Sequence, residues 1–190
     1  MSTINVNAID KESGSTLTLG GSGTTVQPHA SATVSGFGKV LQVVQTVKTD
    51  TFSRASTGGD VGDITGLSVS ITPSSTSSKV LVFATVHHSS ANGQENWIIL
   101  VRDSTNIFIA DAAGSRQRTS SSGRISNQAH QMNSAIMYLD SPNTTSSTTY
   151  KFTGGAEGTN TIYINRSGYD TDADTISRTA SSITVMEIGA

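Results

Sequence analysis

The chain has 190 residues, a formal net charge of -2 and no cysteine; 34% of its residues are hydrophobic and 14% are charged. The near-neutral charge lacks the basic footprint of a nucleic-acid-binding protein. The lack of cysteine excludes disulfides and thiolate metal sites. Low net charge with abundant Val, Ile and Thr favours ordered β-structure over disorder. We therefore expect an all-β protein whose small core favours oligomerisation.

Residues 1–37 differ from the rest of the chain, and we expect them to form an extended Gly/Ser/Thr-rich N-terminal arm. Large apolar residues are few in this arm, and the candidates for assembly contacts are interspersed with polar residues: Ile4, Val6, Ile9, Leu17 and Leu19. Such short strand candidates, closed by Gly turns, cannot bury an apolar side within one chain. Two interpretations remain: a flexible leader, or an assembly arm that becomes ordered against sister subunits. The alternating residues favour the arm.

The first ten residues are polar and lack the apolar stretch of a secretory signal. No apolar run in the sequence approaches the length of a membrane-spanning helix. We therefore expect synthesis and assembly in a reducing cytoplasm, with no membrane insertion.

Residues 38–190 read as one domain of short strands separated by turn signals. Leu41, Val43 and Val47 lie on one side of a first strand, and residues 79–88 form the near-continuous apolar run of a strand buried on both faces. Residues 96–103 and 105–111 predict a hairpin, as do residues 149–158 and 160–168. The strand ending at Ile188 is expected inside a sheet. Eight or nine such strands predict a jelly-roll-like β-sandwich.

Two polar loops are the longest stretches of this domain without a strand pattern. One, residues 116–124, carries Arg116, Arg118 and Arg124; the other carries Asp170, Asp172 and Asp174. Loops held by a rigid β scaffold are the usual place of recognition, so both are candidate outward-facing sites. The alternative is that they are solvated connections of opposite charge that pair with each other.

The three aspartates also make a calcium candidate, because hard cations bind clusters of oxygen ligands. The spacing is not that of an EF-hand loop, and the competing interpretation is an acidic loop neutralised by Arg166 or Arg178. His87 and His88 are adjacent strand residues and face opposite sides, so they cannot share one metal ion. We expect no bound metal.

Enzymatic chemistry has no support in the sequence. There is no G-x-S-x-G motif, and the Gly-rich leader lacks the Lys and the helix of a phosphate-binding loop. Trp97, the single tryptophan, is either a core residue or a sugar-stacking platform, and its apolar neighbours favour the core. We expect no catalytic residues and no cofactor.

Three stretches resemble a known group of proteins: "MSTINVNAIDKESGSTLTLGGSGTTVQ", "GKVLQVVQTVKTDTFS" with "GLSVSITPSSTSSKVLV", and "NRSGYDTDADTISRTASSITVMEI". They are similar to tail-fibre-like and virion-surface proteins of marine tailed bacteriophages of the cyanophage type. The resemblance implies a structural virion component of a short tail-fibre or tail-associated type. By analogy with jelly rolls of this size, which often trimerise, we expect a homotrimer. The resemblance also implies an N-terminal arm that attaches to other virion proteins and a domain presented outward.

This resemblance implies localisation in the virion, after assembly in the host cytoplasm. Host attachment through a surface glycan or an outer-membrane protein would follow from the outward loops. A capsid decoration protein on the head is the alternative within the same class. A free carbohydrate-binding module is the alternative of a different class.

Overall fold

The computed structural model describes residues 39–189, and the predicted arm, with its candidate assembly residues Ile4, Val6, Ile9, Leu17 and Leu19, lies outside that range. The described chain is built from strands, with one helical turn, η1, at Ala91–Gly93. The strands are β1 (Val40–Lys48), β2 (Phe52–Ala55), β3 (Gly62–Ile71), β4 (Lys79–Ser90), β5 (Glu95–Arg102), β6 (Thr105–Ile107), β7 (Ser121–Arg124), β8 (Met132–Asp140), β9 (Thr148–Ala156), β10 (Thr161–Ile164) and β11 (Ser181–Ile188).

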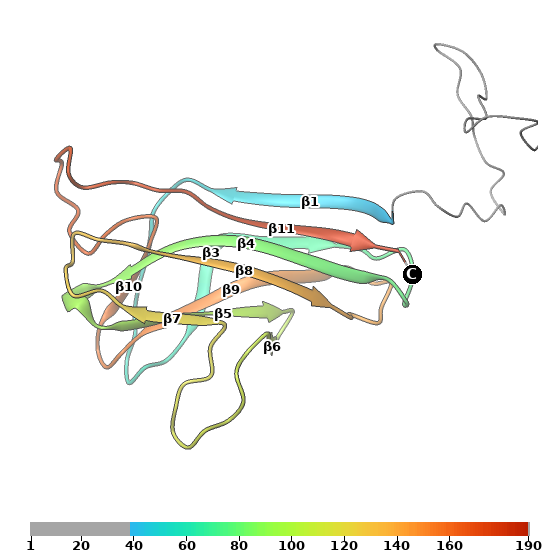
Figure 1. The fold of residues 1–190 in the computed structure, drawn as a ribbon, viewed down its shortest axis with the longest axis horizontal. Coiled ribbons are helices and arrows are strands. Elements are labelled where there is room, and N and C mark those ends of the chain that lie inside the picture. The colour runs from blue at the N-terminus through green and yellow to red at the C-terminus, as the bar shows by residue number, and fades with distance from the viewer. Residues whose placement is uncertain (1–38, 190) are drawn as a thin grey trace, which may run out of the picture. The chain divides into compact units, whose positions relative to one another are not determined.

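The strands form two antiparallel sheets that pack face to face (Figure 1). Sheet A runs β1-β11-β4-β10-β2, and β8 pairs with the other side of β4. Sheet B runs β3-β9-β5-β6, and β7 also pairs with β5. The C-terminal β11 lies between β1 and β4, inside sheet A, as the sequence predicted.

Three of the strand positions are occupied by two segments placed end to end. Along β4, β11 pairs with one half and β10 with the other. β1 and β2 continue this arrangement, since β1 pairs with β11 and β2 with β10. β6 and β7 likewise follow each other along β5. The sandwich therefore has eight strand positions, four in each sheet.

The pairing of these eight positions is nested, which defines the topology. The first position (β1/β2) pairs with the last (β10/β11), and β3, the second, pairs with β9, the seventh. β4 pairs with β8, and β5 with β6/β7. A long antiparallel ribbon folded over itself gives this order, which is that of a jelly roll. The predicted fold class is confirmed.

The core lies between the sheets and is made by alternate residues of the strands. From β3 it contains Leu67, Val69 and Ile71, as their alternation with serines predicted. The other inward-facing residues follow the same period of two in β4, β5, β9, β10 and β11: Val80, Val82, Val86, Ile98, Leu100, Tyr150, Phe152, Ile162, Ile164, Ile183 and Val185.

Three details of the sequence prediction are wrong. β9 and β10 do not form a hairpin, because β9 belongs to sheet B and β10 to sheet A. β4 is not buried on both faces, since Phe83 on its outer side is 38% exposed. Residues 116–124 are not all loop, because β7 occupies the last four of them and pairs with β5.

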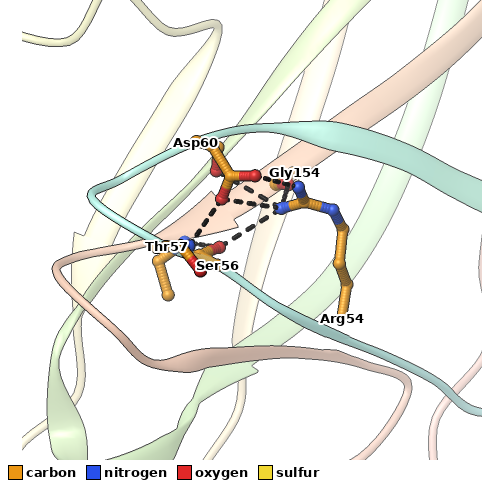
Figure 2. A network of polar contacts seen from close by, with 6 residues as sticks. Arg54, Ser56, Thr57, Asp60 and Gly154 are labelled. Carbon is orange, nitrogen blue, oxygen red and sulfur yellow. Dashed lines mark hydrogen bonds and ion pairs between the residues drawn. The ribbon is translucent and has the colours of Figure 1, made fainter.

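Polar contacts hold the crossing from β2 to β3, where the chain passes from sheet A to sheet B. Figure 2 shows Arg54 of β2 directed at Asp60, with its Nη2 2.5 Å from Oδ2 of the carboxylate. Asp60 also accepts a 2.7 Å hydrogen bond from the N–H of Thr57. Arg54, together with that N–H, lowers the pKa of Asp60 below its usual value. The hydroxyl of Ser56 also accepts a 2.9 Å hydrogen bond from the N–H of Ala156 in β9, which links this crossing to sheet B.

Candidate assembly surface

The outer face of sheet A presents apolar side chains across four neighbouring strands. The strand registers place Val43, Met186, Leu81 and Leu139 side by side in one row across β1, β11, β4 and β8. A second row across the same strands contains Gln45, Thr184, Phe83 and Met137. Neighbouring side chains on one face of an antiparallel sheet are close enough to make a continuous surface. We call this surface the outer A face.

Side chains of the outer A face are far more exposed than a core residue would be. Met137 is 65% exposed, and the three residues that the sequence placed on one side of the first strand, Leu41, Val43 and Val47, are 53–55% exposed. These three do share a face, but it is the outer one. On β1 the inward positions go to Val44, which packs against the core, and to the buried Lys48.

In β4, β8 and β11 the ionisable side chains of this face are Lys79 and His87, one near each end. Lys79 begins β4, where its Nζ donates to Ser141 at 2.7 Å, and His87 lies near the other end of the strand. Between the ends, a shallow groove of about 250 Å³ is lined by Phe83, Ala84, Thr85, Ala135, Ile136, Met137, Ser182 and Thr184. Contiguous apolar patches on a soluble protein mark interaction sites.

The acidic loop, residues 165–180, connects β10 to β11. The buried Asn165 makes hydrogen bonds that fix the two ends of this loop next to each other. Asn165 adopts a left-handed conformation (φ 61°) and its side-chain amide donates to the carbonyls of Lys48 and Asp50, at 2.8 and 3.0 Å. Its side-chain oxygen accepts from Ser181 at 2.6 Å. The loop therefore leaves the strand at Asn165 and rejoins it at Ser181 without changing the register on β4.

Within this loop Asp170 lies between two arginines. Its carboxylate is 3.0 Å from Arg166 and also pairs with Arg178. No group of three His, Asp or Glu side chains in the described residues is arranged to hold a metal ion. Asp172 and Asp174 are exposed. The geometry thus matches the interpretation of an acidic loop neutralised by arginines, and the calcium hypothesis stays a prediction.

The basic loop, residues 108–120, is a second excursion, between β6 and β7, and it lies apart from the acidic loop in Figure 1. Arg116 donates to the carbonyl of Ala113 and Arg118 to that of Ala110. Arg124, at the end of β7, pairs with Glu157. Arg116, Arg118, Arg124 and Asp170 therefore bond to nearby groups instead of pairing across the two loops.

Two of the basic residues do come together on the outer side of sheet B. A groove of about 490 Å³ is lined by Arg116 and Arg124 together with Glu95, Trp97, Ser115, Gln117, Thr119, Ser122 and Glu157. Trp97 is 7% exposed, yet it lies outside the core between the sheets, because alternate residues of β5 face outward. Its ring lies beneath the turn at Gly59, where an added Cβ would be 3.6 Å from the indole.

His88 faces the interior and joins the two sheets. Its Nδ1 contacts the side-chain oxygen of Asn96 in β5, and its Nε2 is 2.8 Å from the hydroxyl of Ser134 in β8. The amide nitrogen of Asn96 donates to the carbonyl of Gly123 at 3.1 Å. The side-chain oxygen of Asn96 is then the acceptor, so His88 is protonated on Nδ1 and accepts from Ser134 on Nε2. This tie is fully buried, and burial lowers the pKa of His88.

Sequence reasoning missed Phe83, Met137 and Leu139 as surface residues. Their alternation with Ala84, Ile136 and Tyr138 was visible, but both sets are apolar, so the pattern does not say which face is buried. The described residues contain no helix that could cross a membrane.

The topology and the surface define a jelly-roll domain with one uncharged apolar face. No protein-family model matches the chain, and no curated protein matches it. Solved structures similar to the chain include infectious bursal disease virus of the Gx strain (15% identity, TM-score 0.34) and of the Gt strain (16%, 0.34). The VP2 subviral particle of the same virus is a third (15%, 0.30). Each match covers 78% of this chain but only 37–38% of the viral chain, so the domain spans little more than a third of those proteins.

Proposed function

We propose that the protein is a non-enzymatic structural subunit of a virion, and that it assembles into a homotrimer through the outer A face. The observation that carries this proposal is the uncharged, mostly apolar surface formed by two rows of side chains across β1, β11, β4 and β8. A face of this kind on an otherwise polar chain is stabilised by burial against a partner. The sequence resemblance to tail-fibre-like and virion-surface proteins of marine tailed phages supplies the virion context.

A trimer is supported by the position of the two edges of sheet A. β1 and β8 lie at opposite edges, and the apolar face lies between them. A contact that brings the β1 side of one copy toward the β8 side of the next is heterologous; such contacts form a ring when the rotation between copies closes, and the ring that we propose has three copies. In the virion we place the subunit in a short tail fibre or a tail-associated position; head decoration is the alternative location.

Oligomeric state in solution tests the proposal. Light scattering on the full chain should give the mass of a trimer, and Met137→Glu with Leu139→Lys should give a folded monomer. Tyr169→Lys is the matched control, because Tyr169 is also large and 50% exposed but lies in the acidic loop. A wild-type chain that is folded and monomeric at micromolar concentration contradicts the proposal.

A second role, host attachment, is favoured by the groove beside Trp97. It gathers guanidinium, carboxylate and amide groups in a depression of about 490 Å³, which is large enough for a sugar or two. Three copies would multiply a weak contact through avidity. Arg116→Ser with Arg124→Ser should reduce adsorption of particles to host cells and leave particle assembly unchanged. Adsorption that is unaffected would remove attachment from the proposed function.

A further inference from the structure

Resting on the proposed trimer, we propose that the free edge of β8 and the groove beside Phe108 form the docking site for the N-terminal arm of a neighbouring copy. The arm segment that binds is the one around Leu17 and Leu19, and it adds to β8 as an extra strand.

β8 is the one long edge strand among the described residues that lacks any break in its pairing. It has nine residues, and its register with β4 runs without a shift from Met132 to Asp140. By contrast, β1 has a register shift after Val40 and β3 has one after Asp63, while β2, β6 and β7 have only three or four residues each.

β8 also lacks the charged residues that usually protect an edge strand. It contains no Lys, Arg or Pro, and its one charged residue, Asp140, turns inward onto Arg102. An exposed edge of this length offers a row of unpaired N–H and C=O groups to any extended chain. Natural proteins cover such edges, so β8 is expected to be covered in the assembled particle.

A groove next to this edge would receive the side chains of an added strand. It measures about 540 Å³ and lies between β6, the start of the basic loop and Tyr138 of β8. Its apolar lining comes from Ile107, Phe108 and Ile109 with Tyr138. Strand addition combines backbone hydrogen bonds at an edge with pockets for alternate side chains, and this site offers both.

Phe108 is held in a conformation that phenylalanine rarely adopts. Its φ is +51°, in the left-handed region, and its side chain is 42% exposed. Its ring centroid is 5.2 Å from that of Tyr138. A bulky residue with positive φ is strained, and such strain is typical of binding sites. The strain places an aromatic ring at the mouth of the groove.

The arm has the sequence and the length for this site. Leu17 and Leu19 alternate with Thr16 and Thr18, so an extended arm would direct both leucines to one side. The 19 residues from Gly20 to Gly38 can span about 60 Å when extended. In its own copy the arm enters at β1, at the opposite edge of sheet A from β8. To reach β8 of its own copy, the arm would have to cross the outer A face, which the proposed trimer covers. In that trimer the β8 of a neighbouring copy lies next to β1, where the arm begins.

Photo-cross-linking on the full chain tests the inference. Phe108→p-benzoylphenylalanine places the probe in the groove, and Tyr169→p-benzoylphenylalanine is the control at an exposed aromatic elsewhere. Probe-bearing light copies are assembled with ¹⁵N-labelled copies, and cross-linked peptides are identified by mass spectrometry. We expect the probe at position 108 to capture labelled peptides from residues 1–37, and the control to capture none above background.

A second pair of variants tests the alternation. Leu17→Asp with Leu19→Asp should abolish the cross-link, whereas Thr16→Asp with Thr18→Asp, the same change on the other side, should retain it. Capture of arm peptides from the same copy only, of non-arm peptides, or of nothing overturns the inference. The mass of the same sample is measured by light scattering: a trimer without the arm cross-link refutes the inference alone, and a monomer refutes the proposed function with it.

Discussion

The hydroxyl of Tyr150 donates a 2.7 Å hydrogen bond to Oδ2 of Asp140, deep in one end of the sandwich. Tyr150 is in sheet B and Asp140 in sheet A, and Arg102 of sheet B holds the same carboxylate at 2.8 and 2.9 Å. Burial, reinforced by Asp140, raises the pKa of Tyr150, so the phenol stays protonated and remains a donor. The carboxylate of Asp140 in sheet A is thus bound by side chains from two strands of sheet B, β5 and β9.

Removing the two members of this contact should have unequal effects. Tyr150→Phe removes one hydrogen bond and should lower the free energy of unfolding by about 1–2 kcal/mol. Asp140→Ala leaves Arg102 without its partner and should cost more, about 2–4 kcal/mol, because a half-buried charge then lacks compensation. Urea unfolding followed by circular dichroism measures both. Equal losses would contradict the shared role of the carboxylate.

Acidification from pH 7 to pH 5 should destabilise the fold through His88. The pKa of His88 in the folded protein is lowered by burial, whereas an unfolded histidine titrates near 6.5. The unfolded state therefore binds more protons, and the contribution of His88 is complete above about pH 6.5 and declines below it. Unfolding free energies measured at several pH values should show this slope.

The matched variants for this test are the two adjacent histidines. His88→Gln should be less stable at pH 7 but should show a weaker pH dependence. His87→Gln should keep most of the slope, because His87 lies half-buried on the outer A face. If both variants retain the wild-type slope, His88 is not the group that titrates.

A second acid transition should follow from Glu187. The side chain is buried at the end of β11, and burial alone would raise its pKa. Gln42 donates to its carboxylate at 2.6 Å, and the hydroxyl and N–H of Ser74 donate at 2.6 and 2.7 Å. These bonds outweigh burial and lower the pKa of Glu187 to about 2.

Because this pKa is depressed, the stabilisation is present above the unfolded value of about 4.3 and is lost as pH falls toward 2. We expect a loss of about 3 kcal/mol across that window. Glu187→Gln should be less stable at pH 6 and should lack this part of the pH dependence in acid titrations followed by fluorescence. A variant curve parallel to wild type between pH 5 and pH 2 would rule out Glu187.

Charge removal in the acidic loop should hardly affect the fold. Asp170 is 38% exposed at its side chain, and exposed ion pairs contribute about 0–1 kcal/mol. Asp170→Ser should therefore lower the free energy of unfolding by less than about 1 kcal/mol. Asp172→Ser and Asp174→Ser should leave the melting temperature unchanged. Calorimetry compares the three; a large loss for Asp174→Ser would reveal a structural role that its exposure does not suggest.

The sequence predicted the strands better than it predicted their partners. The alternation of Leu67, Val69 and Ile71 with serines places them correctly in the core. A period of two does not encode the neighbouring strand, so the short connection at residues 157–160 suggested a hairpin where the chain instead crosses between sheets. For Leu41, Val43 and Val47, the pattern gave a shared face but not its exposure, because the outer A face is also apolar.

The candidate functional surfaces were only partly visible in the sequence. The two charged loops stood out because strand patterns stop there, and Arg116 and Arg124 do share one groove. The edge of β8 and the groove at Phe108 depend on which strands lie at the margins of the sheets, and on a backbone angle. Neither follows from residue type or spacing.

β10 and β11 lie end to end along β4, so the register of sheet A does not depend on the length of the acidic loop between them. The side chains of Asn165 and Ser181 are hydrogen-bonded where the loop leaves sheet A and returns to it. The number of residues between them therefore does not affect the pairing of the strands. We therefore expect the exposed part of this loop, residues 169–175, to accept foreign peptides without a change in the register of sheet A. The same domain could carry new surface sequences, by evolution or by design, while its neighbours in an assembly meet an unaltered sheet.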